Sequence, residues 1–191
     1  MLSKIKNKVS KLFNLPAKIL VNMGFAPNLL TFLGLLFSIF SGILYYFRCI
    51  FYAGILVLVS GLLDALDGAV ARLSGKITAF GGFFDSVADR YSDAIILASI
   101  ILSGLCDIFW GILAIIGCFL VSYCRARGEA AGVEKMSIGI AERPERLIIL
   151  ALATFLEVFF SKAIYYAVIL LVALSHFTVV QRIYYVWKNL R

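Results

Sequence analysis

The stretch 61-GLLDALDGAVAR-72, followed closely by 85-DSVADR-90, places four aspartates in the middle of an otherwise apolar chain. The 191 residues are 62% hydrophobic and 15% charged, whereas soluble domains are about 45–50% apolar and about 25% charged. Uncharged runs such as Ile19 to Phe47 are long enough for a helix that crosses the hydrocarbon core, which takes roughly 20 residues. The composition therefore predicts an all-α integral membrane protein, in which buried carboxylates need an explanation.

Outward from this stretch, the hydrophobic pattern predicts six transmembrane helices. Their expected ranges are 28–47, 51–73, 81–104, 107–130, 143–160 and 163–187. In residues 3–14, apolar side chains and lysines recur on opposite sides at helical spacing, which favours an amphipathic interfacial helix over a solvated basic tail. Pro16 is expected to end that helix. With no repeat or linker in the sequence, we expect one membrane domain over 1–191, with a juxtamembrane amphipathic segment at 1–18.

The basic residues predict the orientation of these spans. Of the 18 Lys and Arg residues, all but Arg48 and Lys162 fall on the face that also carries both termini and the aspartates. By the positive-inside rule, this pattern predicts a multi-pass protein of the cell membrane with its active site and both termini on the cytoplasmic side. The net charge of +7 therefore indicates a surface that faces anionic lipid or an anionic substrate. It is not interpreted as a sign of nucleic-acid binding.

The spacing of the aspartates indicates a shared site. Asp64 and Asp67 are three residues apart and Asp85 and Asp89 are four apart, so each pair lies on one side of its helix. An antiparallel helix pair joined by a short loop brings the two pairs together, and divalent cations would relieve their mutual repulsion. Oxygen ligands without nearby His or Cys favour Mg²⁺, Mn²⁺ or Ca²⁺. Interhelical salt bridges, an ion path and plain loop charges are the alternatives.

Small residues beside the aspartates favour the approach of a ligand. Gly68 and Ala71 follow Asp64 at helical spacing and leave a shallow helix face, while Arg72 supplies a positive charge for a phosphate. The four cysteines have no metal-ligand spacing, and His176 is the single histidine. We interpret the cysteines and His176 as residues of helix packing.

The pattern Asp64-x2-Asp67-Gly68-x2-Ala71-Arg72-x8-Gly81-x3-Asp85-x3-Asp89 resembles, at every fixed position, the signature of the CDP-alcohol phosphotransferases. The resemblance implies an enzyme that binds two divalent ions, Mg²⁺ or Mn²⁺, through these four aspartates, with Asp89 also the catalytic general base. It implies a CDP-linked membrane lipid as donor and a homodimer. The CDP-lipid pocket would be lined by Asn28, Thr31, Asp67, Gly68, Ala71, Arg72 and Thr78, where Asn28 and Thr31 come from the similar segment 27-PNLLT-31.

A separate group of arginines indicates an anionic acceptor. Arg125 and Arg182 lie near the cytoplasmic ends of two predicted spans, and Arg143 and Arg146 lie three apart at the start of another. Arginines that converge from three helices at one membrane level would form a phosphate pocket beside the aspartates. Anchors that snorkel to lipid headgroups are the alternative for any one of them.

The segments 122-SYCRARGEAAG-132, 142-ERPERL-147 and 181-QRIYYVW-187 are similar to those of the family branch that makes phosphatidylinositol phosphate, and of its archaeal counterpart. This resemblance implies an acceptor site of Ser122, Arg125, Arg143, Arg146 and Arg182, with Arg125 standing where lysine is usual. The expected reaction transfers the lipid-phosphate moiety of CDP-archaeol or CDP-diacylglycerol to a small polar phosphorylated acceptor, inositol 1-phosphate, and releases CMP.

Two alternatives to this function stay open at the level of sequence. One is the same chemistry with another acceptor such as glycerol 3-phosphate. The other is an ion transporter, which would need acidic residues spread across the membrane depth, whereas these aspartates cluster near one face. The content of Lys, Ile and Phe favours an archaeal lipid on composition alone.

Overall fold

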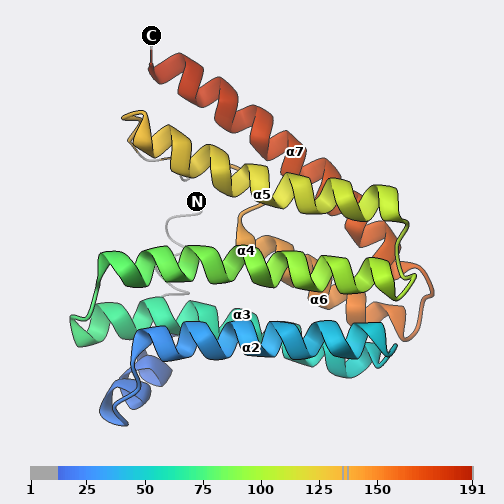
Figure 1. Cartoon of the computed structure of the whole chain (residues 1–191), viewed down its shortest axis with the longest axis horizontal. Helices are drawn as coiled ribbons and strands as arrows, with labels where there is room; N and C mark the ends of the chain where they lie inside the picture. Colours follow the sequence, from blue (N-terminus) through green and yellow to red (C-terminus); the bar gives the residue numbers. More distant parts are fainter. Residues whose placement is uncertain (1–12, 135, 137, 191) are drawn as a thin grey trace.

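The computed structural model describes residues 13–134, 136 and 138–190, and every regular element within them is a helix (Figure 1). Six long helices follow one another along the chain. They are α2 (Pro27–Tyr46), α3 (Ile50–Ser74), α4 (Ala79–Leu102), α5 (Ile108–Ala130), α6 (Arg143–Glu157) and α7 (Ala163–Asn189). Their ends fall within three residues of the six predicted segments, so the helical pattern read from the sequence is confirmed.

The amphipathic helix predicted at 3–14 lies almost entirely outside the described residues. Residues 13–22 are helical and contain Pro16, so the prediction that Pro16 ends the helix is wrong. Proline removes a backbone donor, but its fixed φ is itself helical, and the chain can continue through it. The helix ends instead at a turn in which Gly24 has φ +81° and the Phe25 amide donates to the Leu20 carbonyl at 3.0 Å.

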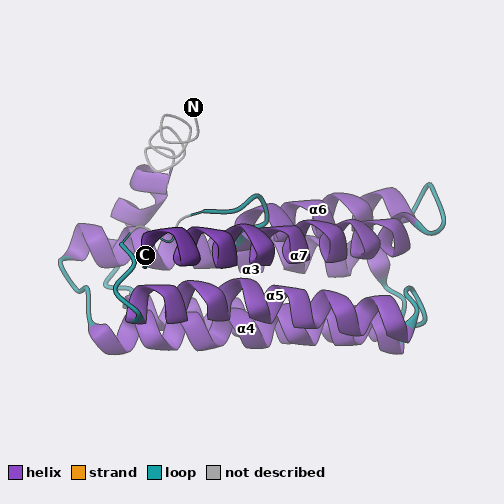
Figure 2. Ribbon diagram, turned by 90° about the horizontal axis from the view of Figure 1, so that it is seen from above, coloured by secondary structure: helices purple, strands orange, loops and turns teal. Residues whose placement is uncertain are grey.

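The six long helices form a closed ring. α2 packs on α3 and α4, α3 packs on α6, α6 packs on α7, and α5 joins α7 to α4. Figure 2 shows the helices running along a common axis. One end of the ring carries the α3–α4 and α5–α6 connections together with the start of α2 and the end of α7 (Figure 1). Segments that are far apart in the sequence therefore meet at this end.

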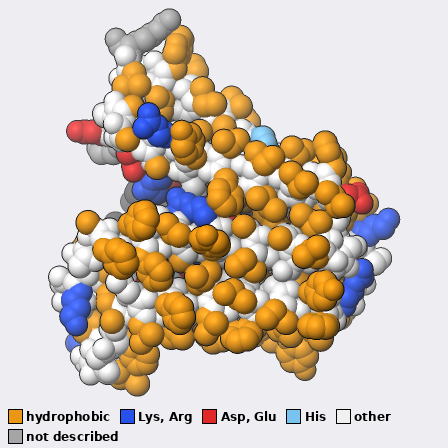
Figure 3. Space-filling model, viewed as in Figure 1, with side chains coloured by type: hydrophobic (Ala, Val, Ile, Leu, Met, Phe, Trp, Pro, Cys, Tyr) orange, Lys and Arg blue, Asp and Glu red, His pale blue; other side chains and the backbone are white. Residues whose placement is uncertain are grey.

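Four helices, α2, α3, α5 and α7, are long and apolar enough to cross a membrane by length and composition. α6 has only 15 residues, and α4 carries Asp85, Asp89, Arg90 and Asp93. The two remaining helices, α4 and α6, both contribute charged residues to the site described below. Figure 3 shows apolar side chains over most of the visible surface, with the basic residues gathered near its margins and in a central hollow.

Small and hydroxyl-bearing residues let the helices pack closely. A Cβ at Gly54 of α3 would lie 2.9 Å from the Thr154 side chain of α6, so a larger residue would push these helices apart. The buried hydroxyls of Tyr45 and Thr154 are 2.5 Å apart and form a hydrogen bond between α2 and α6. Such contacts are typical of helix packing in membranes, where close backbone approach and polar pairs replace the hydrophobic effect between helices.

Candidate active site

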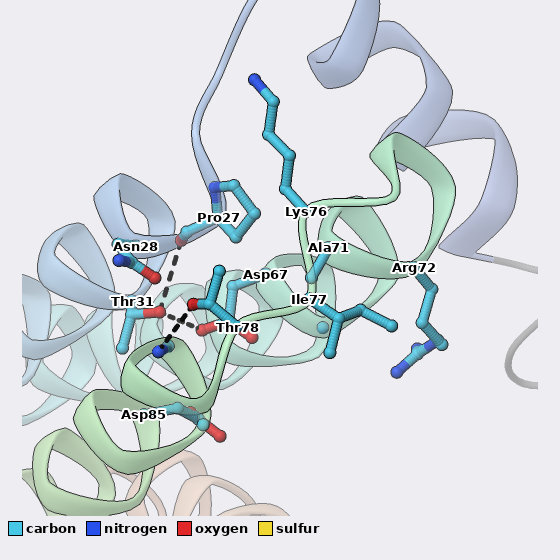
Figure 4. Close-up of a pocket in the computed structure, with 13 residues that line it drawn as sticks. Pro27, Asn28, Thr31, Asp67, Ala71, Arg72, Lys76, Ile77, Thr78 and Asp85 are labelled. Atoms are coloured by element: carbon cyan, nitrogen blue, oxygen red, sulfur yellow. Dashed lines mark hydrogen bonds between the residues drawn. The ribbon is translucent and has the colours of Figure 1, made fainter.

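The first cavity, of about 310 Å³, opens between the start of α2, the end of α3 and the start of α4 (Figure 4). All seven residues that the sequence assigned to the CDP-lipid line it. They are Asn28, Thr31, Asp67, Gly68, Ala71, Arg72 and Thr78. Lys76 and Ile77 of the α3–α4 connection also line it, and neither was predicted as a site residue from the sequence. Both residues lie in the loop between two parts of the aspartate motif, and this position could have indicated that they line the site.

Local backbone chemistry builds this cavity. Gly75 ends α3 with φ +67°, in the left-handed region that glycine adopts without a steric penalty. Three residues later, the Thr78 side chain caps α4 by accepting a hydrogen bond from the Gly81 amide at 3.0 Å. A Cβ at Gly81 would lie 3.0 Å from Thr78 Oγ1 and 3.1 Å from Asn28 Oδ1. Because glycine has no side chain, Thr78 and Asn28 can both lie this close to the backbone of α4 at Gly81.

Three of the four predicted metal ligands form one group. Asp64 and Asp67 of α3 and Asp85 of α4 each offer a carboxylate oxygen, and these oxygens lie within 4.8 Å of one another. Asp67 is only 6% exposed, and Thr31 Oγ1 donates a hydrogen bond of 2.5 Å to its Oδ2. Within the described part of the chain, Asp85 Oδ1 is buried without a hydrogen-bond partner. An all-oxygen group with an unsatisfied carboxylate oxygen fits a hard divalent cation.

Asp89, the fourth predicted ligand, lies outside this group and is held by Arg143. Arg143 Nη1 lies 2.6 Å from Asp64 Oδ1 and 2.9 Å from Asp89 Oδ1. The same guanidinium places its Nε 3.6 Å from Asp93 Oδ1. The sequence assigned Arg143 to an acceptor phosphate and did not select Asp93. Asp93 follows Asp89 by four residues on the same helix, and this spacing was the signal that could have found it.

A second cavity, of about 540 Å³, opens on the other side of the aspartates. All five predicted acceptor residues line it: Ser122, Arg125, Arg143, Arg146 and Arg182. Asp67, Gly68, Arg72 and Asp85 line both cavities. The structure thus brings the two predicted sites together, with the carboxylate group between them. Arg90, Asp93, Glu129 and Glu142 also line the second cavity and were not selected from the sequence.

The four arginines predicted for the acceptor differ in the groups that they already bind within the protein. Arg182 is 2% exposed; its Nε donates to the Ile138 carbonyl at 2.7 Å, and its Nη1 donates to the Val121 carbonyl. Arg146 is 4% exposed and donates to Asp93 Oδ2 at 2.6 Å. These two side chains hold backbone and helices in place, whereas Arg125 is about half exposed.

Arg125 is paired only loosely. Its Nε lies 3.0 Å from Glu129 Oε1, one helical turn away, and both side chains are 48% exposed. An exposed pair of this kind is worth about 0–1 kcal/mol. Arg125 can therefore exchange Glu129 for another anion at little cost in free energy.

The comparison with protein families agrees with this geometry. The family model for CDP-alcohol phosphatidyltransferases matches residues 25–180, which include every residue that lines the two cavities except Arg182. The chain belongs to the CDP-alcohol phosphatidyltransferase family. It is accordingly a transferase and a membrane protein. The family expected from the aspartate motif is thus confirmed.

Two archaeal relatives of this transferase share one name. It is 43% identical over 192 residues to the archaetidylinositol phosphate synthase of Pyrococcus horikoshii, and the match covers 100% of this chain and 98% of that protein. A protein of the same name in Methanothermobacter thermautotrophicus is 47% identical over 118 residues, which are 60% of this chain and 58% of that protein.

Among solved structures, this transferase is similar to Mycobacterium tuberculosis phosphatidylinositol phosphate synthase. The crystal structure of that protein with CDP-DAG bound matches with a TM-score of 0.80 and 29% identity, over 93% of this chain and 94% of that chain. Its complex with manganese and citrate also matches with a TM-score of 0.80, at 30% identity, over 92% of this chain and 88% of that chain.

Proposed function

We propose that this transferase moves the lipid-phosphate moiety of a CDP-linked lipid to inositol 1-phosphate and releases CMP. The observation that carries the proposal is the meeting of two cavities at one carboxylate group, the second of them lined by six arginines, among which are all four that the sequence predicted for the acceptor. The names of the archaeal and mycobacterial relatives support inositol phosphate as the acceptor. The archaeal relatives support CDP-archaeol, rather than CDP-diacylglycerol, as the donor.

The first cavity suits the nucleotide of the donor. Asn28, Thr31 and Thr78 supply polar groups to its lining (Figure 4). Ala71 and Gly68 line it without a bulky side chain. A pyrophosphate placed between the cavities would lie beside Arg72, which lines both. This placement puts the lipid-side phosphorus at the carboxylate group, where the acceptor can reach it.

Asp64, Asp67 and Asp85 would hold a divalent cation, Mg²⁺ or Mn²⁺, and Asp89 would complete a second site beside them. When bound, such cations polarise phosphoryl oxygens and stabilise the charge that develops on a leaving phosphate. The hydrogen bond from Thr31 holds Asp67 in one orientation for this purpose. The acidic group thus serves the phosphates of the donor rather than the fold.

The residues of the chain account for the remaining steps. Asp89 would accept the proton of the acceptor hydroxyl as the hydroxyl oxygen bonds to the lipid-side phosphorus and the bond from that phosphorus to the CMP oxygen breaks. Arg125 and Arg143 would bind the acceptor phosphate, because Arg146 and Arg182 are committed to Asp93 and to backbone carbonyls. Arg146 and Arg182 would then position the second cavity rather than bind the substrate.

A panel of acceptors tests this function. We expect CMP release from CDP-archaeol to be about 100-fold or more faster with inositol 1-phosphate than with free inositol, because a site built for a phosphate leaves its charges unpaired without one. Mass spectrometry of the lipid product identifies both the acceptor and the lipid. Faster turnover with glycerol 3-phosphate would overturn the acceptor, and a preference for CDP-diacylglycerol would overturn the lipid.

We further propose six spans with both termini in the cytoplasm and an interfacial N-terminal helix. Cys49 offers a test of the orientation, because it is exposed in the α2–α3 connection at the end of the ring opposite the site. A membrane-impermeant maleimide added to intact cells is expected to label the protein at Cys49 and not in a Cys49→Ser variant. Labelling only after the membrane is opened would reverse the proposed orientation.

We also propose that residues 1–191 form one membrane domain that works as a homodimer. Both parts come from the sequence pattern and the family resemblance. Light scattering of the detergent-solubilised protein tests the dimer, and a mass of one chain under conditions of full activity would contradict it.

A further inference from the structure

Arg143 occupies an unexpected place between two carboxylates that come from different helices. Its Nη1 lies within 3 Å of oxygens of both Asp64 on α3 and Asp89 on α4. The Arg143 side chain is 11% exposed, so these ion pairs are only weakly screened by solvent. One positive charge thus partly neutralises a predicted metal ligand and the predicted base.

The ion pairs leave donors of Arg143 unsatisfied. Within the described part of the chain, Arg143 Nε and Nη1 are buried without a hydrogen bond of good geometry, although carboxylate oxygens are close. The guanidinium is therefore held by charge and not by a complete set of aligned hydrogen bonds. A phosphate can accept parallel hydrogen bonds from the edge of a guanidinium, which single carboxylate oxygens on separate helices cannot match.

The second cavity brings such a phosphate within reach, since Arg143 lines it together with Arg125. Asp93 lies on the same side, with its Oδ1 3.6 Å from Arg143 Nε and its Oδ2 bound to Arg146. Because Arg146 fixes Asp93, this carboxylate can keep its attraction for Arg143 while the Nη1 end of the guanidinium changes partner. Arg143 can thus move between two sets of anions without leaving the site.

We propose that Arg143 couples the two cavities by exchanging partners. Without an acceptor it neutralises Asp64 and Asp89; a phosphorylated acceptor draws the guanidinium away and leaves both carboxylates free, Asp89 for the proton and both for a divalent cation. An unphosphorylated alcohol has no charge with which to draw Arg143 away, so the requirement for a phosphate becomes part of catalysis. The inference rests on the proposed function for the identity of the acceptor.

Linkage makes this inference measurable without turnover. If phosphate releases Asp64 and Asp89 for a cation, phosphate and cation must each strengthen the binding of the other by the same factor. We expect the binding of Mn²⁺ to the purified protein in nanodiscs, followed by electron paramagnetic resonance, to tighten about tenfold with saturating inositol 1-phosphate. Inorganic phosphate should act in the same direction, and free inositol should have no effect.

Variants separate this exchange from direct contact between phosphate and metal. Arg143→Gln should bind Mn²⁺ about tenfold more tightly than the wild type without phosphate and respond no further to phosphate. Arg143→Lys keeps the charge and should keep a response. Arg125→Gln, the matched control in the same cavity, should need more phosphate but reach the same tightening. A response that persists in Arg143→Gln would show direct ligation of the metal by phosphate and overturn the inference.

The outcomes also distinguish this inference from the proposed function. If neither inorganic phosphate nor inositol 1-phosphate changes the Mn²⁺ affinity of the wild type, while inositol 1-phosphate is turned over, the exchange is wrong and the function stands. If inorganic phosphate tightens Mn²⁺ binding through Arg143 but inositol 1-phosphate is not turned over, the exchange stands and the acceptor is wrong. The wild-type titration keeps the exchange open to refutation even if Arg143→Gln does not fold, because a Mn²⁺ affinity that does not change with phosphate would overturn it.

Discussion

Replacing Asp89 with asparagine is expected to lower the rate of transfer to inositol 1-phosphate by about 10²–10⁴-fold, the usual contribution of a general base. Asparagine keeps the size of the side chain but cannot accept the proton of the acceptor hydroxyl. Asp89 lines the second cavity and not the first. Binding of the CDP-lipid, measured by titration in nanodiscs, should therefore change little.

The matched control for this variant is Asp107→Asn. Asp107 precedes α5 at the end of the ring opposite the site, so the same change there should leave transfer at the wild-type rate. An Asp89→Asn protein that keeps a rate within a few-fold of the wild type would show that the proton goes elsewhere. Loss of CDP-lipid binding in Asp89→Asn would instead indicate that Asp89 supports the donor site.

Removal of divalent cations is expected to abolish CMP release, and Mg²⁺ or Mn²⁺ is expected to restore it. Without a cation, the close carboxylates of Asp64, Asp67 and Asp85 face the negative pyrophosphate of the donor directly. Like charges at short range inside a membrane protein are costly. The measurement is CMP release before and after treatment with a chelator, with Mn²⁺ binding followed in parallel by electron paramagnetic resonance.

Two variants make the metal experiment specific to these carboxylates. Asp85→Asn should weaken Mn²⁺ binding strongly, because the buried Asp85 Oδ1 is otherwise without a hydrogen-bond partner among the described residues. Glu129→Gln removes a carboxylate of the second cavity that pairs with Arg125, and it should leave Mn²⁺ binding in place. Full activity in the chelated protein would reject the metal site altogether.

Local spacing made much of this site predictable. Side chains three or four residues apart share a helix face, so the sequence places Asp64 with Asp67 and Asp85 with Asp89 without any knowledge of the fold. The short connection between α3 and α4 then brings the two pairs near each other. For the same reason, the residues around the first cavity could be named in advance, since most lie within or beside one motif.

Pairings between distant helices were not predictable in this way. Arg143 and Asp89 are both marked by the sequence, but their contact depends on how α6 packs in the ring. Arg182 shows the same limit: its position in α7 indicated a phosphate ligand, and only the structure shows that it donates to the Ile138 and Val121 carbonyls. An arginine looks the same in sequence whether its charge serves a ligand or the backbone.

The sequence by itself determined that this is a helical chain of membrane composition and to which family it belongs, and it predicted that the chemistry lies at the aspartates of 61-GLLDALDGAVAR-72 and 85-DSVADR-90. These conclusions depend on composition and on spacing within single helices. The tertiary structure alone decided that the ring joins two cavities at those aspartates and that Arg143 lies between Asp64 and Asp89. Contacts of that kind arise only when helices distant in the sequence pack side by side.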